Sequence, residues 1–168
     1  MRSLTSYAPP TKTTPFLNTY KAFCNYYSTH ISRQILYFIE NQELAGSIEL
    51  DLTQLPGIEP GITVSCTLTP LIMALKHDTY FRSVVLADVA RRDLFPLLAS
   101  AMKTNSVITK LVVIGTDAEV ESKFIPSAFD SPAGIGEFAH AIRHNKNCAL
   151  QIMDFSEQKN MEKGIMLL

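Results

Sequence analysis

Ala74-Leu75-Lys76-His77-Asp78 is the stretch that decides the fold, because closely similar pentapeptides recur at 101–105 and 141–145. The later copies read Ala101-Met102-Lys103-Thr104-Asn105 and Ala141-Ile142-Arg143-His144-Asn145. Each copy ends a short apolar segment with helical periodicity, and each precedes a strand-like segment. A unit that recurs in phase with such elements predicts an array of strand-and-helix units.

The strand-like segments share one spacing of apolar residues, and they predict strands over 47–52, 81–86, 108–113 and 150–155. The second apolar position of each strand serves as a mark, and these marks are Leu50, Val84, Leu111 and Met153, separated by 34, 27 and 42 residues. The shortest interval is close to the roughly 28 residues of long leucine-rich repeats. Two long loops, predicted near 55–65 and 115–130, account for the longer intervals.

The pattern therefore predicts an α/β fold, a leucine-rich-repeat solenoid of the ribonuclease-inhibitor-like type with one strand and one helix per repeat. Stacked repeats bury apolar faces that no single repeat can bury alone. The small Ala of each pentapeptide suits close approach of neighbouring units, and its terminal Asp or Asn is suited to bind nearby backbone. A generic α/β arrangement of the same elements is the alternative.

Composition divides the chain into three parts. Residues 1–15 are rich in Ser, Thr and Pro, which predicts a disordered lead-in. Residues 16–46 predict a helical linker that caps the first repeat, with apolar residues at helical spacing: Phe16, Tyr20, Phe23 and Tyr27, then Ile31, Ile35, Phe38 and Ile39. Residues 47–168 predict about three and a half repeats, truncated within a fourth helix from 161.

Helix starts are expected where a capping residue precedes an apolar segment. Thr69 is the expected N-cap of the first repeat helix, with Pro70 at its first position. Asp93 is expected to cap the second helix, with Pro96 in its first turn. Ser131-Pro132 is expected to open the third helix in the same way.

Composition and charge exclude several classes of function. The chain has 168 residues, 46% of them apolar, and a net charge of −1, so we expect one domain and no nucleic-acid partner. Cys24, Cys66 and Cys148 share no CxxC spacing, which favours reduced thiols in an intracellular protein. No segment predicts a membrane span or a secretory signal, and Pro9-Pro10 disfavours a transit peptide. A cytoplasmic location is expected.

No motif predicts catalysis, a cofactor or a metal. His140 and His144 have the spacing of a two-ligand metal site, but no third ligand is suitably spaced, so solvated helix residues are the preferred interpretation. Gly134-Ile135-Gly136 follows a helix start rather than a strand, so it is no dinucleotide fingerprint. A hydrolase using either histidine is the weakest alternative. We therefore expect a protein that is not an enzyme.

The strand residues that alternate with the apolar marks are the candidate interaction residues, because they face away from the helices. A mixed polar and apolar stripe on a concave face suits a protein partner, although a merely solvated stripe is the competing interpretation. The candidates are Glu49, Asp51, Ser83, Val85, Lys110, Val112, Ile152 and Asp154.

The order of segments from about Phe16 to Leu168 resembles the start of the leucine-rich-repeat region in the CARMIL family (capping protein regulator and myosin-I linker). The similar segments are Tyr20-Lys21-Ala22-Phe23-Cys24, Glu49-Leu50-Asp51-Leu52, the pentapeptide at 74–78, Tyr80-Phe81, Asn105-Ser106, Leu111-Val112, His144-Asn145-Lys146-Asn147 and Glu162-Lys163-Gly164. The resemblance implies a non-catalytic protein-interaction scaffold that helps regulate actin filament assembly and capping protein at the cell cortex or lamellipodium, with partners from the actin-assembly machinery.

The chain lacks several segments of that family, so we expect it to be a fragment or a truncated relative. These are a pleckstrin-homology-like domain, a dimerisation segment, a basic capping-protein-binding motif and a proline-rich tail. Capping-protein inhibition is therefore assigned to no residue here, and peripheral membrane association is expected only through domains absent from this chain. An unrelated leucine-rich-repeat protein, either a small-GTPase regulator or an innate-immune sensor fragment, is the alternative.

Overall fold

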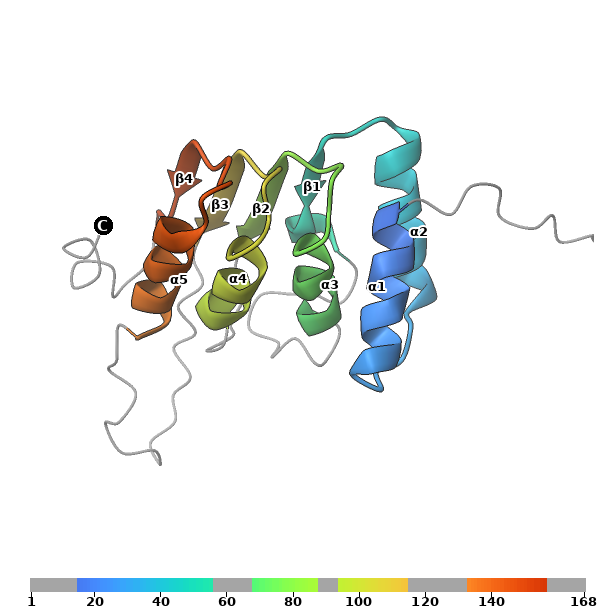
Figure 1. Cartoon of the computed structure of the whole chain (residues 1–168). Coiled ribbons are helices and arrows are strands. Elements are labelled where there is room, and N and C mark those ends of the chain that lie inside the picture. The colour runs from blue at the N-terminus through green and yellow to red at the C-terminus, as the bar shows by residue number, and fades with distance from the viewer. Residues whose placement is uncertain (1–14, 56–67, 88–93, 115–132, 157–168) are drawn as a thin grey trace, which may run out of the picture.

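The structure is a computed structural model that describes residues 15–55, 68–87, 94–114 and 133–156. Within these ranges the chain is mixed α/β, and helices alternate with strands from residue 49 onward (Figure 1). The elements are α1 (Pro15–Tyr26), α2 (Arg33–Leu44), β1 (Glu49–Asp51), the 3₁₀ helix η1 (Leu52–Gln54), α3 (Leu68–Leu75), β2 (Ser83–Ala87), α4 (Leu94–Met102), β3 (Lys110–Ile114), α5 (Ala133–His144) and β4 (Ile152–Asp154).

The four strands form one parallel sheet in the order β1-β2-β3-β4, so each strand pairs with the next one along the chain. The register places the four sequence marks opposite one another: Leu50 pairs with Val84, Val84 with Leu111, and Leu111 with Met153. The alignment predicted from apolar spacing is therefore confirmed, although the intervening segments differ in length.

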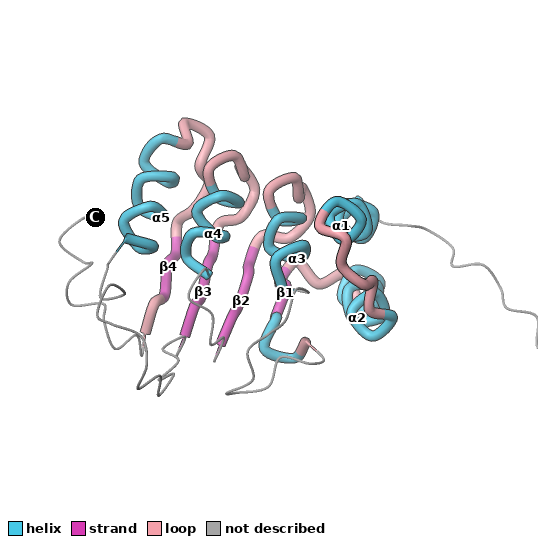
Figure 2. Tube along the Cα trace, turned by 90° about the horizontal axis from the view of Figure 1, so that it is seen from below, coloured by secondary structure: helices cyan, strands magenta, loops and turns pink. Residues whose placement is uncertain are grey.

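Helices α3, α4 and α5 lie side by side on one face of this sheet, and α1 lies beside α3 at the β1 end (Figures 1 and 2). The helical segment predicted over 16–46 is present as two helices, α1 and α2. Phe16, Leu17, Tyr20 and Cys24 of α1 are buried, and the Phe16 ring meets the Phe81 ring edge to face at a centroid distance of 5.1 Å. The end of the core next to α3 is thus covered by α1.

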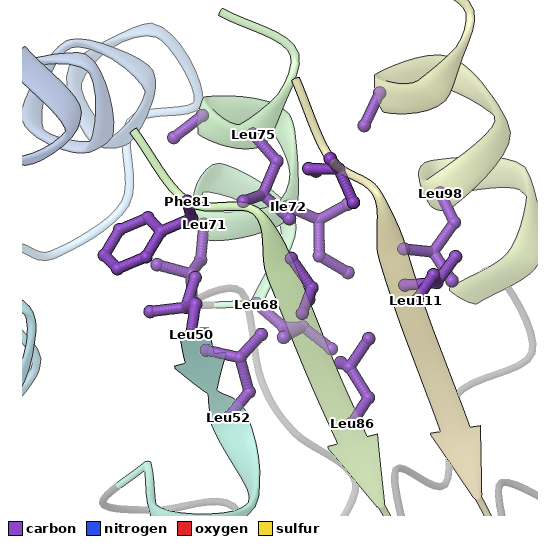
Figure 3. Packing of buried hydrophobic residues seen from close by; sticks show 14 of the residues in the cluster. Leu50, Leu52, Leu68, Leu71, Ile72, Leu75, Phe81, Leu86, Leu98 and Leu111 are labelled. Atoms are coloured by element: carbon purple, nitrogen blue, oxygen red, sulfur yellow. The ribbon is translucent and has the colours of Figure 1, made fainter. Parts of the chain in front are cut away.

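The core lies between the sheet and the helix layer. Because side chains alternate along a strand, one set faces the helices, and these residues interleave with apolar side chains of α3 and α4 (Figure 3). Labelled members of this cluster are Leu50, Leu52, Leu68, Leu71, Ile72, Leu75, Phe81, Leu86, Leu98 and Leu111. The pentapeptide residues Ala74, Ala101 and Ala141 are buried as well, as their small size led us to expect.

The last residue of each pentapeptide binds the backbone that follows it. The Asp78 carboxylate accepts hydrogen bonds from the N–H groups of Tyr80 (3.0 Å) and Phe81 (2.8 Å). Asn105 Oδ1 accepts from Val107 (2.8 Å) and Ile108 (2.9 Å) in the same way. The predicted turn role is confirmed. It also explains why β2 and β3 begin two residues later than predicted, because Phe81 and Ile108 donate to these side chains instead of to a strand.

The two asparagines also join successive units. Asn105 Nδ2 donates to the carbonyls of Leu75 (2.7 Å) and Asp78 (3.4 Å), whereas Asn145 Nδ2 donates to those of Met102 (2.8 Å) and Asn105 (2.7 Å). Asp78 stands first in this series and has only acceptor oxygens. Burial raises the pKa of its carboxyl group, against the opposing effect of the N–H groups of Tyr80, Phe81 and Thr79.

Some local details differ from the pattern of the other strands or from the predicted helix boundaries. Met153 is 43% exposed, whereas Leu50, Val84 and Leu111 are buried, since β4 pairs only with β3 in the described sheet. Thr69 lies inside α3 rather than at its N-cap, because the helix begins at Leu68. Tyr27 lies beyond the end of α1 at Tyr26 and is exposed, whereas Phe23 is partly buried and packs against the core.

Other expectations fall outside the described residues. They concern the disordered lead-in, the two long loops, the cap at Asp93, the helix start at Ser131-Pro132 and the helix from 161. Pro96 does lie in the first turn of α4, as predicted.

Candidate interaction surface

Figure 2 shows α3, α4 and α5 on one side of the sheet. Because side chains alternate along a strand, the eight candidate residues lie on the opposite face from the buried Leu50, Val84 and Leu111, and we call this face the outer face. The strand register arranges them in two rows that cross the strands. The first row is Glu49, Ser83, Lys110 and Ile152, and the second row is Asp51, Val85, Val112 and Asp154. Residues up to 105 positions apart in the sequence are thereby brought onto one surface.

The first row is organised around the Glu49 carboxylate. Glu49 Oε2 accepts a hydrogen bond from Ser83 Oγ at 2.7 Å and an ion-paired one from Lys110 Nζ at 3.3 Å, so the side chains bridge three strands. The Ser83 hydroxyl, followed by Lys110, holds the pKa of Glu49 below its ordinary value of 4.5. The Glu49 and Lys110 side chains are both partly exposed, so the pair contributes mainly to local order and only weakly to stability.

The second row has a carboxylate at each end and two valines between them. Asp51 Oδ1 accepts hydrogen bonds from the N–H and the hydroxyl of Thr53 at 3.0 and 2.5 Å. Asp154 Oδ1 accepts from the Ser156 N–H at 3.0 Å. Both carboxylates are therefore held by the residue two positions beyond them, at the ends of the outermost strands, β1 and β4.

The outer face has a third row that the sequence analysis missed. Ala87 pairs with Ile114 one pleat beyond Val85 and Val112, and all four side chains share the outer face of β2 and β3. The predicted strands ended at Leu86 and Val113, one residue short of these positions. Extending the alternation of each strand by one residue identifies both of them.

The candidates differ in accessibility, which the alternation along each strand does not predict. Ser83 and Val112 are each 8% exposed, because they lie in the middle of the sheet between occupied neighbouring strands. Ile152, on β4, is 55% exposed. The accessible part of the outer face therefore consists of the charged side chains and the β4 end, and the apolar side chains of Val85 and Val112 lie between them on the central strands.

A shallow groove of about 530 Å³ lies between α4 and α5 on the helix side of the sheet. Its walls include Ala99, Gly136 and Ala141, with Lys103 and His140 among the polar lining residues. The groove is open, and half of its lining residues are polar, whereas small-molecule sites are enclosed and mostly apolar, which weakens the groove as a small-molecule site.

The two histidines of α5 lie together but in an arrangement that does not suit metal binding. Their ring centroids are 3.9 Å apart with an interplanar angle of 24°, and His144 Nδ1 lies 2.9 Å from the His140 carbonyl oxygen. Stacked rings point their lone pairs along nearly parallel directions, whereas one metal ion needs them to converge. Within the described ranges, no group of three His, Cys, Asp or Glu side chains is arranged to hold a metal ion.

No protein-family model matches the chain, and comparison with curated proteins gives no match. None of the helices in the described ranges has the length and apolar character that crossing a bilayer requires.

Proposed function

We propose that this chain is a non-catalytic protein-interaction scaffold, a leucine-rich-repeat solenoid with an N-terminal helical cap, which binds its partner through the outer face. The observation that carries the proposal is the register, which aligns Leu50, Val84, Leu111 and Met153 across consecutive strands with every described crossover helix on one side of the sheet. Such an array leaves one extended sheet face for a partner.

The asparagine contacts support the repeat interpretation independently of the strands. Asn105 corresponds to Asp78 in the preceding pentapeptide, and it donates to the carbonyls of Asp78 and of Leu75, three positions earlier. Asn145 corresponds to Asn105, and in the same way it donates to the carbonyls of Asn105 and of Met102, three positions earlier. Equivalent residues in equivalent roles are what stacked repeats require.

The biological setting is proposed from the resemblance to the CARMIL family. By this proposal the scaffold contributes to the regulation of actin filament assembly and capping protein in the cytoplasm, at the cell cortex, and its partners belong to the actin-assembly machinery. The ordered polar row on the outer face supports a binding role, because Glu49 is held between Ser83 and Lys110 and needs little reordering on contact.

Site-specific photocrosslinking tests this proposal. Benzoylphenylalanine replacing Ile152 places the probe on the outer face, and the matched control replaces Tyr37, which is similarly exposed (67% against 55%) but lies on α2. In extract from motile cells we expect the first probe to capture actin-assembly proteins and the control to capture none of them. Capture of a small GTPase would favour the alternative function, and equal capture by both probes would exclude the outer face as the binding surface.

A further inference from the structure

We infer that the outer face recognises an extended, basic protein segment with the pattern basic-x-apolar-x-basic, running across the strands along the second row. This inference rests on the proposed function and specifies the chemistry of the partner. The juxtaposition that carries it is the row Asp51, Val85, Val112 and Asp154, which no stretch of sequence displays.

The charge of the outer face selects a basic partner. Its described strand residues include three carboxylates and one ammonium group, and that ammonium group, on Lys110, is already paired with Glu49 at 3.3 Å. Three carboxylates and one ammonium group give these described strand residues a net charge of −2, whereas the chain as a whole is nearly neutral at −1. Complementary potentials steer association and suppress like-charged ligands. An anionic lipid surface or a nucleic acid is disfavoured for the same reason.

The spacing of the row selects an extended segment. Neighbouring strands lie about 4.8 Å apart, so the strands that carry Asp51 and Asp154 are separated by about 14 Å. An extended chain rises about 3.3 Å per residue and presents residues i, i+2 and i+4 on one side, which spans about 13 Å. Two basic residues at the ends of such a segment therefore reach the two carboxylates.

The floor of the row selects the middle residue of the segment. Val85 and Val112 lie between the carboxylates, and Ala87 and Ile114 extend the apolar area by one further row. An aliphatic side chain at the centre of the segment covers this area when the flanking residues reach Asp51 and Asp154. The polar positions between the basic and apolar residues then point to solvent.

Two synthetic peptides and the ¹⁵N-labelled chain test the inference. The probe is acetyl-Gly-Lys-Thr-Leu-Thr-Lys-Gly-amide, and its matched control has Glu in place of both Lys residues. We expect the lysine peptide to shift the amide resonances of 85–87, 110–114 and 152–154, and the glutamate peptide to leave them unchanged. Asp154→Asn should weaken the lysine peptide about two- to fivefold, the range of exposed ion pairs. Glu137→Gln, which removes the same charge at the α4–α5 groove, should leave its affinity unchanged.

Several results would overturn the inference. These are no shift with the lysine peptide, equal shifts with both peptides, equal weakening by Asp154→Asn and Glu137→Gln, or stronger binding to vesicles of phosphatidylcholine and phosphatidylserine than to the peptide. Failure of the proposed function is distinguishable from these outcomes, because it appears as loss of the selective crosslinking at Ile152. Selective crosslinking together with no preference for the lysine peptide would leave the scaffold intact and reject only the basic partner.

Discussion

Replacing Asn105 by Ala should destabilise the protein, because this side chain joins the turn after α4 to the turn after α3. The residue is 2% exposed and makes four hydrogen bonds. Its amide group donates to the carbonyls of Leu75 and Asp78, and its oxygen accepts from the N–H groups of Val107 and Ile108.

The size of the effect follows from which backbone groups lose their partners. The Ile108 N–H is buried and loses its acceptor, whereas the Val107 N–H is only partly buried, which lets water replace the side chain. The Leu75 carbonyl keeps a hydrogen bond from the Asp78 N–H at 3.2 Å. The Asp78 carbonyl also loses a buried but longer hydrogen bond, of 3.4 Å. With about 1–3 kcal/mol for each buried group left unpaired, and the Asp78 carbonyl at the lower end of that range, we expect a loss of about 2–4 kcal/mol in the free energy of unfolding.

Urea unfolding followed by circular dichroism measures this loss from the transition midpoint and slope. The neighbouring exposed residue Thr104 provides the control, since Thr104→Ala should change the free energy by no more than about 0.5 kcal/mol. Asn145→Ala should fall between the two, because Asn145 is only partly buried. An Asn105→Ala loss as small as that of Thr104→Ala would refute the reasoning that these contacts hold neighbouring units together.

Three further substitutions test the core and its buried polar groups. Phe81→Ala should cost about 3–5 kcal/mol in urea unfolding, because the ring is fully buried against Phe16; a loss below about 1 kcal/mol would contradict this packing. Because burial raises the pKa of Asp78, its carboxyl group contributes most to stability below pH 3.8, its ordinary pKa, and this contribution is lost as pH rises through the folded-state pKa. The free energy of unfolding of the wild type minus that of Asp78→Asn should therefore fall as pH rises from 3.8 through the folded-state pKa. A difference that stays flat or rises would contradict the raised pKa. Tyr20→Phe should leave the midpoint unchanged or raise stability by up to about 1 kcal/mol, since the buried hydroxyl lacks a hydrogen-bond partner in the described structure; a clear loss would mean that this hydroxyl is paired.

The fold was predictable from the sequence to the extent that it depends on local patterns. The periodicity of 16–46 predicted α1 and α2, and the apolar spacing placed Leu50, Val84 and Leu111 in register. Strand starts were predicted two residues early, because Phe81 and Ile108 are apolar like strand residues but donate to Asp78 and Asn105. Apolar character alone does not distinguish these positions from strand positions.

The candidate surface was predictable by position but not in its interactions. Alternation along each strand identified all eight residues on the outer face, and it failed only at Ala87 and Ile114, beyond the predicted strand ends. Accessibility was not predictable, because the burial of Ser83 and Val112 depends on the strands on either side of them.

By itself, the sequence determined which residues of β1, β2, β3 and β4 align and which side chains of each strand face the helices, because the apolar spacing that sets both is a pattern of residues a few positions apart. The tertiary structure alone decided which of these residues meet. Lys110 contacts Glu49, 61 positions away in the sequence, and Asn145 contacts Met102, 43 positions away. The register also places Asp51 and Asp154 at the two ends of the row that contains Val85 and Val112. Such contacts depend on how strands stack, and stacking is a property of the assembled core rather than of any one segment.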